Sequence, residues 1–203
     1  NLGAQALLSV NDACDTADFS SICGGDLLCL DTGEESICTQ VAQDCGEFST
    51  TALTANADQP DRFELEGAND GAANLSSACD LAEAERLAQT DSAEYTEYVN
   101  TNCSLGSCGG GGPNTVAVLT TEVAAQFDCT LTGDGDPLLY VRSYCAENDA
   151  VAELACNDDI DNQDQSSALT FSLEANETAY LIVDGYGGAF AGTFSLTCTR
   201  TAR

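Results

Sequence analysis

The sequence contains no lysine, methionine, tryptophan or histidine, and it has only five arginines. Without histidine or lysine, active sites of the Ser-His-Asp and Cys-His types are excluded. Zinc sites that combine cysteine with histidine are excluded for the same reason. Paired carboxylates could hydrolyse glycosides, but no indole ring is available as a platform for a sugar. We therefore expect that the protein is not an enzyme.

Positive charge is scarce, because five arginines face 34 aspartates and glutamates and the net charge is −29. No basic stripe can neutralise phosphates, so nucleic acid is excluded as a partner. The apolar runs are far shorter than the ~20 residues that span a bilayer, so we expect no membrane span. Two interpretations of the acidic surface stay open, namely a solvated coat and specific cation sites. An apolar content of 43% is enough for a folded core.

Cysteine is abundant, and its even number favours disulfides formed in an oxidising compartment. The spacings lack the paired CxxC knuckles of zinc sites. Since the sequence also shows neither an initiator methionine nor a basic leader, we expect a mature secreted protein at the extracellular surface. The twelve candidates for disulfides are Cys14, Cys23, Cys29, Cys38, Cys45, Cys79, Cys103, Cys108, Cys129, Cys145, Cys156 and Cys198.

Residues 1–10 alternate between apolar and other side chains, which predicts a strand. Gly3, Gln5 and Ser9 lie on one face, and Leu7 is the exception to the pattern. This strand could pair with a sheet of its own chain or be donated to the open sheet edge of another subunit. Its apolar face consists of Leu2, Ala4, Ala6, Leu8 and Val10.

Residues 11–46 are predicted to form a small disulfide-rich unit, because about 35 residues cannot bury a sufficient core. The unit holds five cysteines, so at least one must pair outside it. Residues 47–203 are predicted to form the main domain, which begins with a linker or weak strand over 47–60. Helical spacing over about 80–99 predicts a helical insertion, capped by Asp80 and bracketed by Cys79 and Cys103.

The rest of the main domain is predicted to consist of short strands separated by turns. The glycines of 109–112 lack the Lys-Ser/Thr of a phosphate-binding loop and are expected to form a flexible turn. Residues 147–154 and 155–165 are expected to be loops. The fold class is therefore all-β, a β-sandwich or jelly roll with a small N-terminal cysteine-rich unit and one short helical insertion. Strands are expected at 62–67, 115–119, 123–131, 138–144, 168–173, 179–183 and 192–199.

Carboxylates and amides gather near the predicted strand ends, and calcium is bound by six to eight such oxygen ligands. Dense carboxylates repel one another unless a cation lies among them. We therefore consider calcium a candidate cofactor. The alternative is an ordinary acidic hairpin loop closed by a Cys145–Cys156 disulfide. The candidate metal ligands are Asp134, Asp136, Asn157, Asp158, Asp159, Asp161 and Asp184.

The stretch from Cys103 to Thr199 contains, in order, Cys108–Gly112, Asp136–Arg142, Cys145, Ala155–Asp159, Leu169, Phe171, Leu173, Tyr180–Tyr186 and Gly192–Leu196. With these segments it resembles the pre-peptidase C-terminal (PPC-like) family of secreted bacterial β-sandwich domains. The helical insertion departs from the family pattern. The resemblance implies a non-catalytic accessory module of the kind that binds collagen or carbohydrate, sometimes with calcium.

Two functions of different classes follow. The first is an extracellular structural protein, for example a filament or surface-layer subunit, that self-associates by addition of the N-terminal strand. The second is a secreted module of a hydrolase or adhesin that binds a polysaccharide or another extracellular protein. Its candidate aromatic platforms are Tyr95, Tyr98, Tyr144 and Tyr186, and the alternative for each is packing in the core or in an interface.

Overall fold

The structure is a computed structural model, and it divides the chain into two compact units, Asn1–Gln43 and Asp44–Arg203. Each unit is described by itself. The boundary lies a few residues before the one expected at residue 46. The described residues are 7–8, 22–23, 27–31, 36–40, 45, 49–69, 74, 76, 79–103, 107–145, 153–186 and 192–202.

The first unit contains two small sheets. Strand β1 (Leu7–Leu8) pairs in parallel with β2 (Ile22–Cys23). Strand β3 (Leu27–Asp31) pairs antiparallel with β4 (Ser36–Gln40). Of the predicted N-terminal strand, only residues 7 and 8 are described, and they pair inside this unit. The predicted assembly residues Leu2, Ala4, Ala6 and Val10 lie outside the described residues.

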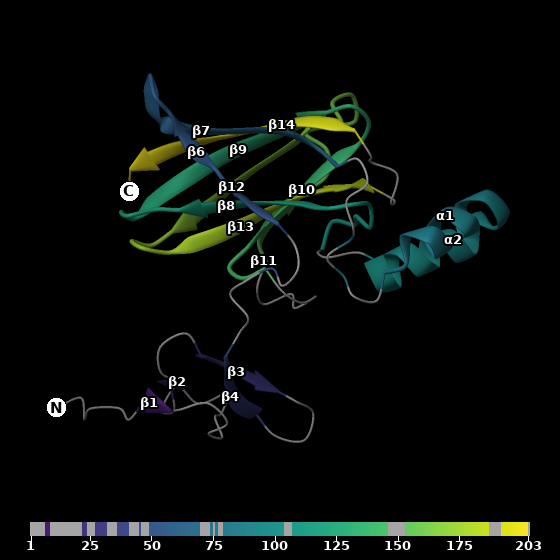
Figure 1. The fold of residues 1–203 in the computed structure, drawn as a ribbon, viewed down its shortest axis with the longest axis horizontal. Coiled ribbons are helices and arrows are strands. Elements are labelled where there is room, and N and C mark those ends of the chain that lie inside the picture. Colours follow the sequence, from purple (N-terminus) through teal and green to yellow (C-terminus); the bar gives the residue numbers. More distant parts are fainter. Residues whose placement is uncertain are drawn as a thin grey trace. The chain divides into compact units, whose positions relative to one another are not determined.

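The second unit is a sandwich of two five-stranded sheets, so the predicted all-β sandwich is confirmed (Figure 1). All strand pairs are antiparallel except β5 with β8. One sheet has the order β11 (Glu153–Asn157), β10 (Pro137–Arg142), β13 (Thr178–Gly185), β8 (Thr115–Thr120), β5 (Thr50–Ala52). The other has the order β12 (Ser167–Leu173), β9 (Ala125–Gly133), β14 (Thr193–Ala202), β7 (Gln59–Ala68), β6 (Thr54–Asn56).

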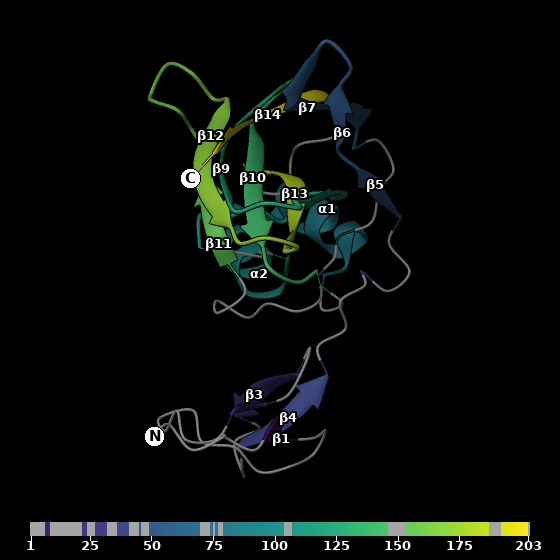
Figure 2. The same ribbon diagram turned by 90° about the vertical axis from the view of Figure 1, so that its left-hand side faces the viewer.

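The core lies between the two sheets, as the alternation of apolar residues requires. In β9, buried residues alternate with partly or fully exposed ones, and its Phe127 is fully buried. The Phe127 ring lies 6.0 Å from that of Phe63 and 5.4 Å from that of Phe171, measured between centroids. Strands β10 and β13 are neighbours and are almost wholly buried, because one face packs in the core between the sheets and the other packs in a second cluster with Cys45 and Cys145. Figure 2 shows β12 at the margin of the sandwich.

The helical insertion consists of α1 (Leu81–Thr90), α2 (Ser92–Tyr98) and one π-helical turn, η1 (Val99–Cys103). The Asp80 side chain accepts hydrogen bonds from the first-turn amides of α1, as predicted, and Asp91 does the same for α2. A disulfide joins Cys79 to Cys103. In the described part of the chain, no helix is long and apolar enough to cross a membrane.

Two predictions about local structure were wrong. Residues 153–157 were expected to lie in loops but form the edge strand β11. The predicted closure of the acidic loop by Cys145–Cys156 is also wrong, because Cys145 pairs with Cys45 and Cys156 pairs with Cys108. The strand order brings together cysteines that are 100 and 48 residues apart in the chain. The spacing of cysteines along the chain does not reveal that order.

Candidate functional site

Three of the predicted metal ligands meet at one end of the sandwich. Asp136 lies directly before β10, and Asp158 and Asp159 lie directly after β11. Since β10 and β11 are antiparallel neighbours, the start of one strand lies beside the end of the other. One carboxylate oxygen from each of the three residues lies within 4.8 Å of the others. We call these residues the acidic triad.

The three carboxylates of the acidic triad lie so close together that each disfavours the ionised form of its neighbours. Burial, followed by the charges of Asp136 and Asp159, raises the pKa of Asp158 to about 6. Burial, followed by the charge of Asp159, also raises the pKa of Asp136. The described ion pairs lie elsewhere and involve Glu64, Glu83 and Asp61.

Hydrogen bonds satisfy the acidic triad only in part. Gln165 Nε2 donates to Asp136 Oδ2 at 3.3 Å. Asp136 Oδ1 and Asp158 Oδ1 are buried oxygens for which the described residues supply no hydrogen-bond donor. A hard cation such as calcium prefers carboxylate oxygens and would supply the missing partner. The residues present therefore fit a calcium ion, with Asp136, Asp158 and Asp159 as its carboxylate ligands.

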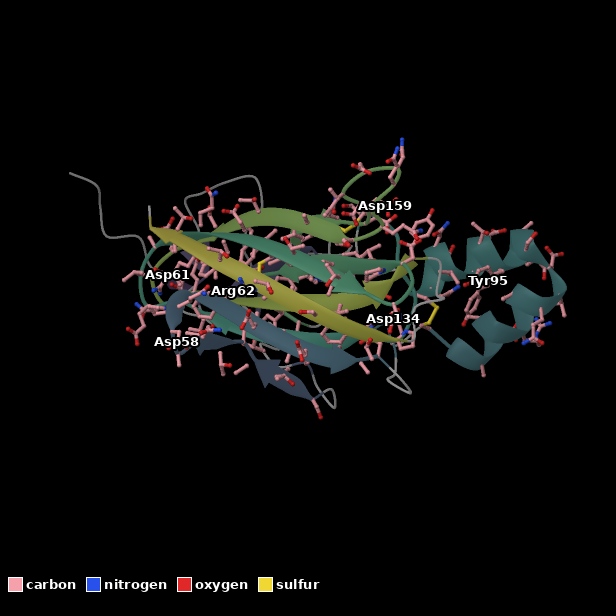
Figure 3. The ribbon with its side chains drawn as sticks, turned by 90° about the horizontal axis from the view of Figure 1, so that it is seen from above. Asp58, Asp61, Arg62, Tyr95, Asp134 and Asp159 are labelled. Carbon is pink, nitrogen blue, oxygen red and sulfur yellow. A yellow bond between two sulfur atoms is a disulfide. The ribbon has the colours of Figure 1, made fainter. Side chains whose placement is uncertain are left out.

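Three other predicted ligands have different hydrogen-bonding roles. Asp134, after Thr132 and Gly133 at the end of β9, accepts a hydrogen bond from Thr193 Oγ1 at 2.6 Å. Asp161 Oδ1 accepts from the amides of residues 163 and 164 and so shapes the loop. Asn157 Oδ1 accepts from Ala168 N at 2.8 Å, while its Nδ2 donates to the main-chain oxygen of Asp159. Figure 3 shows Asp134 and Asp159 well apart, so Asp134 does not join the acidic triad.

Asp184, the seventh predicted ligand, is fully buried away from the acidic triad. Its carboxylate accepts from the amides of Gly111 at 3.1 Å, Gly112 at 2.8 Å and Gly185 at 2.6 Å. Burial raises the pKa of Asp184 to about 7, although these hydrogen bonds oppose the shift. Asp184 thus anchors the amides of the glycine-rich turn and lies outside the acidic triad.

The glycine run 109–112 forms a largely buried turn. Gly110, Gly111 and Gly112 are buried, and residues 109–111 have positive φ angles, which glycine adopts readily. A Cβ atom on Gly110 would collide with the Asp184 carboxylate and the Tyr140 hydroxyl. Sequence reasoning missed this buried turn because a run of glycines gives no indication of what packs against it.

Only one of the four candidate tyrosines has a well-exposed ring. Tyr144 is buried, which contradicts its prediction as a surface platform. Tyr95 and Tyr98 are partly buried against the apolar residues of the helical insertion. The Tyr186 side chain is half exposed, and its amide donates to the main-chain oxygen of Asp136 at 3.0 Å. The Tyr186 backbone is thereby fixed beside the acidic triad.

Comparison with known proteins finds no matching family model and no matching curated protein. Two solved structures are similar to the chain at low sequence identity. One is the pre-peptidase C-terminal domain of a collagenase from Bacillus anthracis, with 12% identity, a TM-score of 0.41, and coverage of 75% of this chain and 96% of that one. The other is PliG of Aeromonas hydrophila, a periplasmic inhibitor of g-type lysozyme, with 11% identity, a TM-score of 0.40, and coverage of 75% and 100%. The first is of the family that the sequence resembles. Neither similarity assigns an activity or a ligand to this chain.

Proposed function

We propose that the protein is a non-catalytic structural protein of the cell exterior, whose copies are joined by strand addition. The observation that supports this proposal is which segments of the chain form the strands of the sandwich. The ten strands of the sandwich all follow Gln43, and of residues 1–10 the structure describes Leu7–Leu8, which pair with Ile22–Cys23 in their own unit. The alternating sequence of residues 1–10 supports the proposal, because an added strand needs such a pattern to continue both faces of a sheet.

An extracellular location is supported by the disulfides. In the described part of the second unit, Cys45–Cys145, Cys79–Cys103, Cys108–Cys156 and Cys129–Cys198 are bonded. Such bonds persist in oxidising surroundings and resist unfolding by restricting the unfolded chain. A subunit that remains outside the cell benefits from this resistance.

Calcium is part of the proposal as a stabilising ion at the acidic triad. It is supported by the two buried carboxylate oxygens of Asp136 and Asp158 that lack donors, and by the raised pKa of both groups. Calcium binds the ionised carboxylates, so its effect should grow as the pH rises through about 6. Its role is to neutralise repulsion where β10 and β11 meet the acidic loop.

The second candidate function is a module that binds a polysaccharide or protein. It is favoured by the half-exposed ring of Tyr186 beside the acidic triad. Replacing Tyr186 by alanine would then abolish retention on a polysaccharide column, whereas Tyr95→Ala would leave it unchanged. The structural function requires neither result.

Sedimentation velocity and electron microscopy of the purified, oxidised protein test the structural function. Samples should cover a wide concentration range, with calcium and with excess chelator. We expect oligomers or fibres that grow with concentration. A monodisperse monomer under every condition would contradict the proposed function.

A further inference from the structure

Of the four outer strands of the sandwich, β12 has the longest uncharged edge. Strands β5 and β6 are only three residues long. Strand β11 is tied to the preceding segment by Cys108–Cys156, and Ser107 donates to the Glu153 carboxylate from both its amide and its hydroxyl. Strand β12 reads Ser-Ala-Leu-Thr-Phe-Ser-Leu over seven residues and contains no charge and no proline. Natural sheets usually protect such an edge with charges, proline or bulges.

The direction of the main-chain groups in β12 follows from the neighbouring strands. Cys129 of β9 lies opposite Cys198 of β14, and the two are disulfide-bonded with a Cα–Cα distance of 4.0 Å. So short a distance is typical of a non-hydrogen-bonded pair. The main-chain groups of Cys129 therefore point the other way, toward its partner Leu169 in β12.

In a strand, the main-chain N–H and C=O groups of successive residues point to opposite sides. Those of Ala168, Thr170 and Ser172 therefore point away from β9, toward the open edge. An independent contact agrees, because Ala168 N donates outward to Asn157 Oδ1. Among the described residues, no partner is found for the edge-facing amides of Thr170 and Ser172. The edge thus offers two donors and the matching carbonyl acceptors to one further strand.

The side chains of β12 specify what such a strand must look like. Phe171 and Leu173 are buried in the core and Leu169 packs against it, whereas Thr170 is exposed on the outer face. An added strand must therefore alternate between apolar and polar residues to continue both faces. Residues 1–10 alternate in this way and contain no charged side chain, although the chain as a whole carries −29. Pairing between two uncharged strands avoids the electrostatic repulsion that two acidic copies of the chain would otherwise exert on each other.

We propose that the open edge of β12 is the acceptor site for residues 1–10 of a second copy, whose Leu7–Leu8 would exchange their pairing with Ile22–Cys23 for pairing with β12. This inference rests on the proposed function and identifies the surface through which it acts. Because donor and acceptor are different parts of the chain, the contact is heterologous and can repeat from copy to copy.

The test uses the full chain and the same threonine-to-lysine substitution at two exposed positions, of which Thr170 also donates its hydroxyl to Asp128 Oδ1 at 2.6 Å. Thr170 of β12 and Thr199 of β14 are both exposed, and both lie opposite Asp128 on the outer face. Thr170→Lys places a charge on the open edge, whereas Thr199→Lys places the same charge on an interior strand. Thr170→Pro removes the outward amide directly, which an edge strand tolerates. Circular dichroism and thermal melting check that each variant folds, and the lysine pair suffices if the proline variant does not.

Sedimentation velocity then compares the association of the variants. We expect Thr170→Pro to associate at least about tenfold more weakly, as for the loss of a main-chain hydrogen bond. Thr170→Lys should also associate more weakly, because an added strand would partly desolvate its charge. Thr199→Lys should assemble like the unaltered chain. Leu8→Asp should weaken assembly as much as Thr170→Lys, and a synthetic peptide of residues 1–10 should inhibit assembly of the unaltered chain.

The outcomes separate the two proposals. If the unaltered chain never assembles, the proposed function fails and the acceptor site fails with it. If the unaltered chain assembles and folded Thr170 variants assemble equally well, the function stands and the β12 acceptor site is refuted. If the Thr170 variants fail to assemble while Leu8→Asp and the peptide have no effect, residues 1–10 are refuted as the added strand.

Discussion

Replacing Asp158 by asparagine should stabilise the protein without calcium and destabilise it with calcium. Burial and the charges of Asp136 and Asp159 raise the pKa of Asp158 to about 6, compared with 3.8 for an unperturbed aspartate. A group whose pKa is raised on folding contributes stability at low pH and loses that contribution as the pH rises through the folded value. For Asp158 the loss falls between about pH 4 and 6.

The magnitude follows from the same shift. About two pH units correspond to about 3 kcal/mol for a group shielded from water. Asp158 is only partly buried, and solvent screening reduces the effect to about 1 kcal/mol. In chelator at pH 7.5, Asp158→Asn should therefore raise the melting temperature by about 2–4 °C, the range for 1 kcal/mol in a domain of this size. At pH 4 the variant and the unaltered chain should melt alike.

In calcium, the unaltered chain should melt at a higher temperature than Asp158→Asn. A ligand at about 100 times its dissociation constant stabilises a folded protein by about 2.7 kcal/mol. The unaltered chain should gain this stability and Asp158→Asn should lose most of it. Differential scanning calorimetry in calcium and in chelator measures both effects. The matched control is Asp58→Asn, which removes one charge from an exposed residue at the opposite end of the sandwich from Asp159 (Figure 3). Equal melting temperatures of the unaltered chain in calcium and chelator would refute calcium binding, and a less stable variant in chelator would refute the repulsion.

Two further predictions concern the scaffold. Phe127→Ala should lower the free energy of unfolding by about 3–5 kcal/mol, since its ring is fully buried between those of Phe63 and Phe171; urea denaturation measures this, and a loss below about 1 kcal/mol would contradict the packing. Gly110→Ala should cost about 2 kcal/mol or more, since the φ angle of Gly110 is +105° and the added Cβ meets the Asp184 carboxylate; an unchanged thermal melt would contradict this close packing.

The strands of the sandwich were predictable because their side chains alternate strongly. In β12, Leu169, Phe171 and Leu173 alternate with small polar residues, and the segment indeed forms a strand with its apolar side inward. Strand β11 was missed, because Glu153–Asn157 shows neither a clear alternation nor a strongly apolar run. It forms because β10 offers it an antiparallel partner, which is a property of the sheet rather than of the segment.

The candidate site was predictable in composition but not in arrangement. The sequence placed carboxylates at strand ends, and three of them meet because β10 and β11 are adjacent. It gave no indication that Asp184 would be buried and hold the amides of Gly111 and Gly112 instead. Both outcomes depend on which strands become neighbours, and strand order is set by long-range pairing that local patterns do not encode.

The measurement that tests the central claim most directly is hydrogen exchange at the amides of Thr170 and Ser172 as a function of protein concentration. If residues 1–10 of another copy add to β12, both amides become hydrogen-bonded in the assembly. Their exchange should then slow as the concentration rises, and Thr170→Lys should abolish the slowing at Ser172. Fast exchange at both amides in samples that sedimentation shows to be assembled would contradict strand addition at this edge.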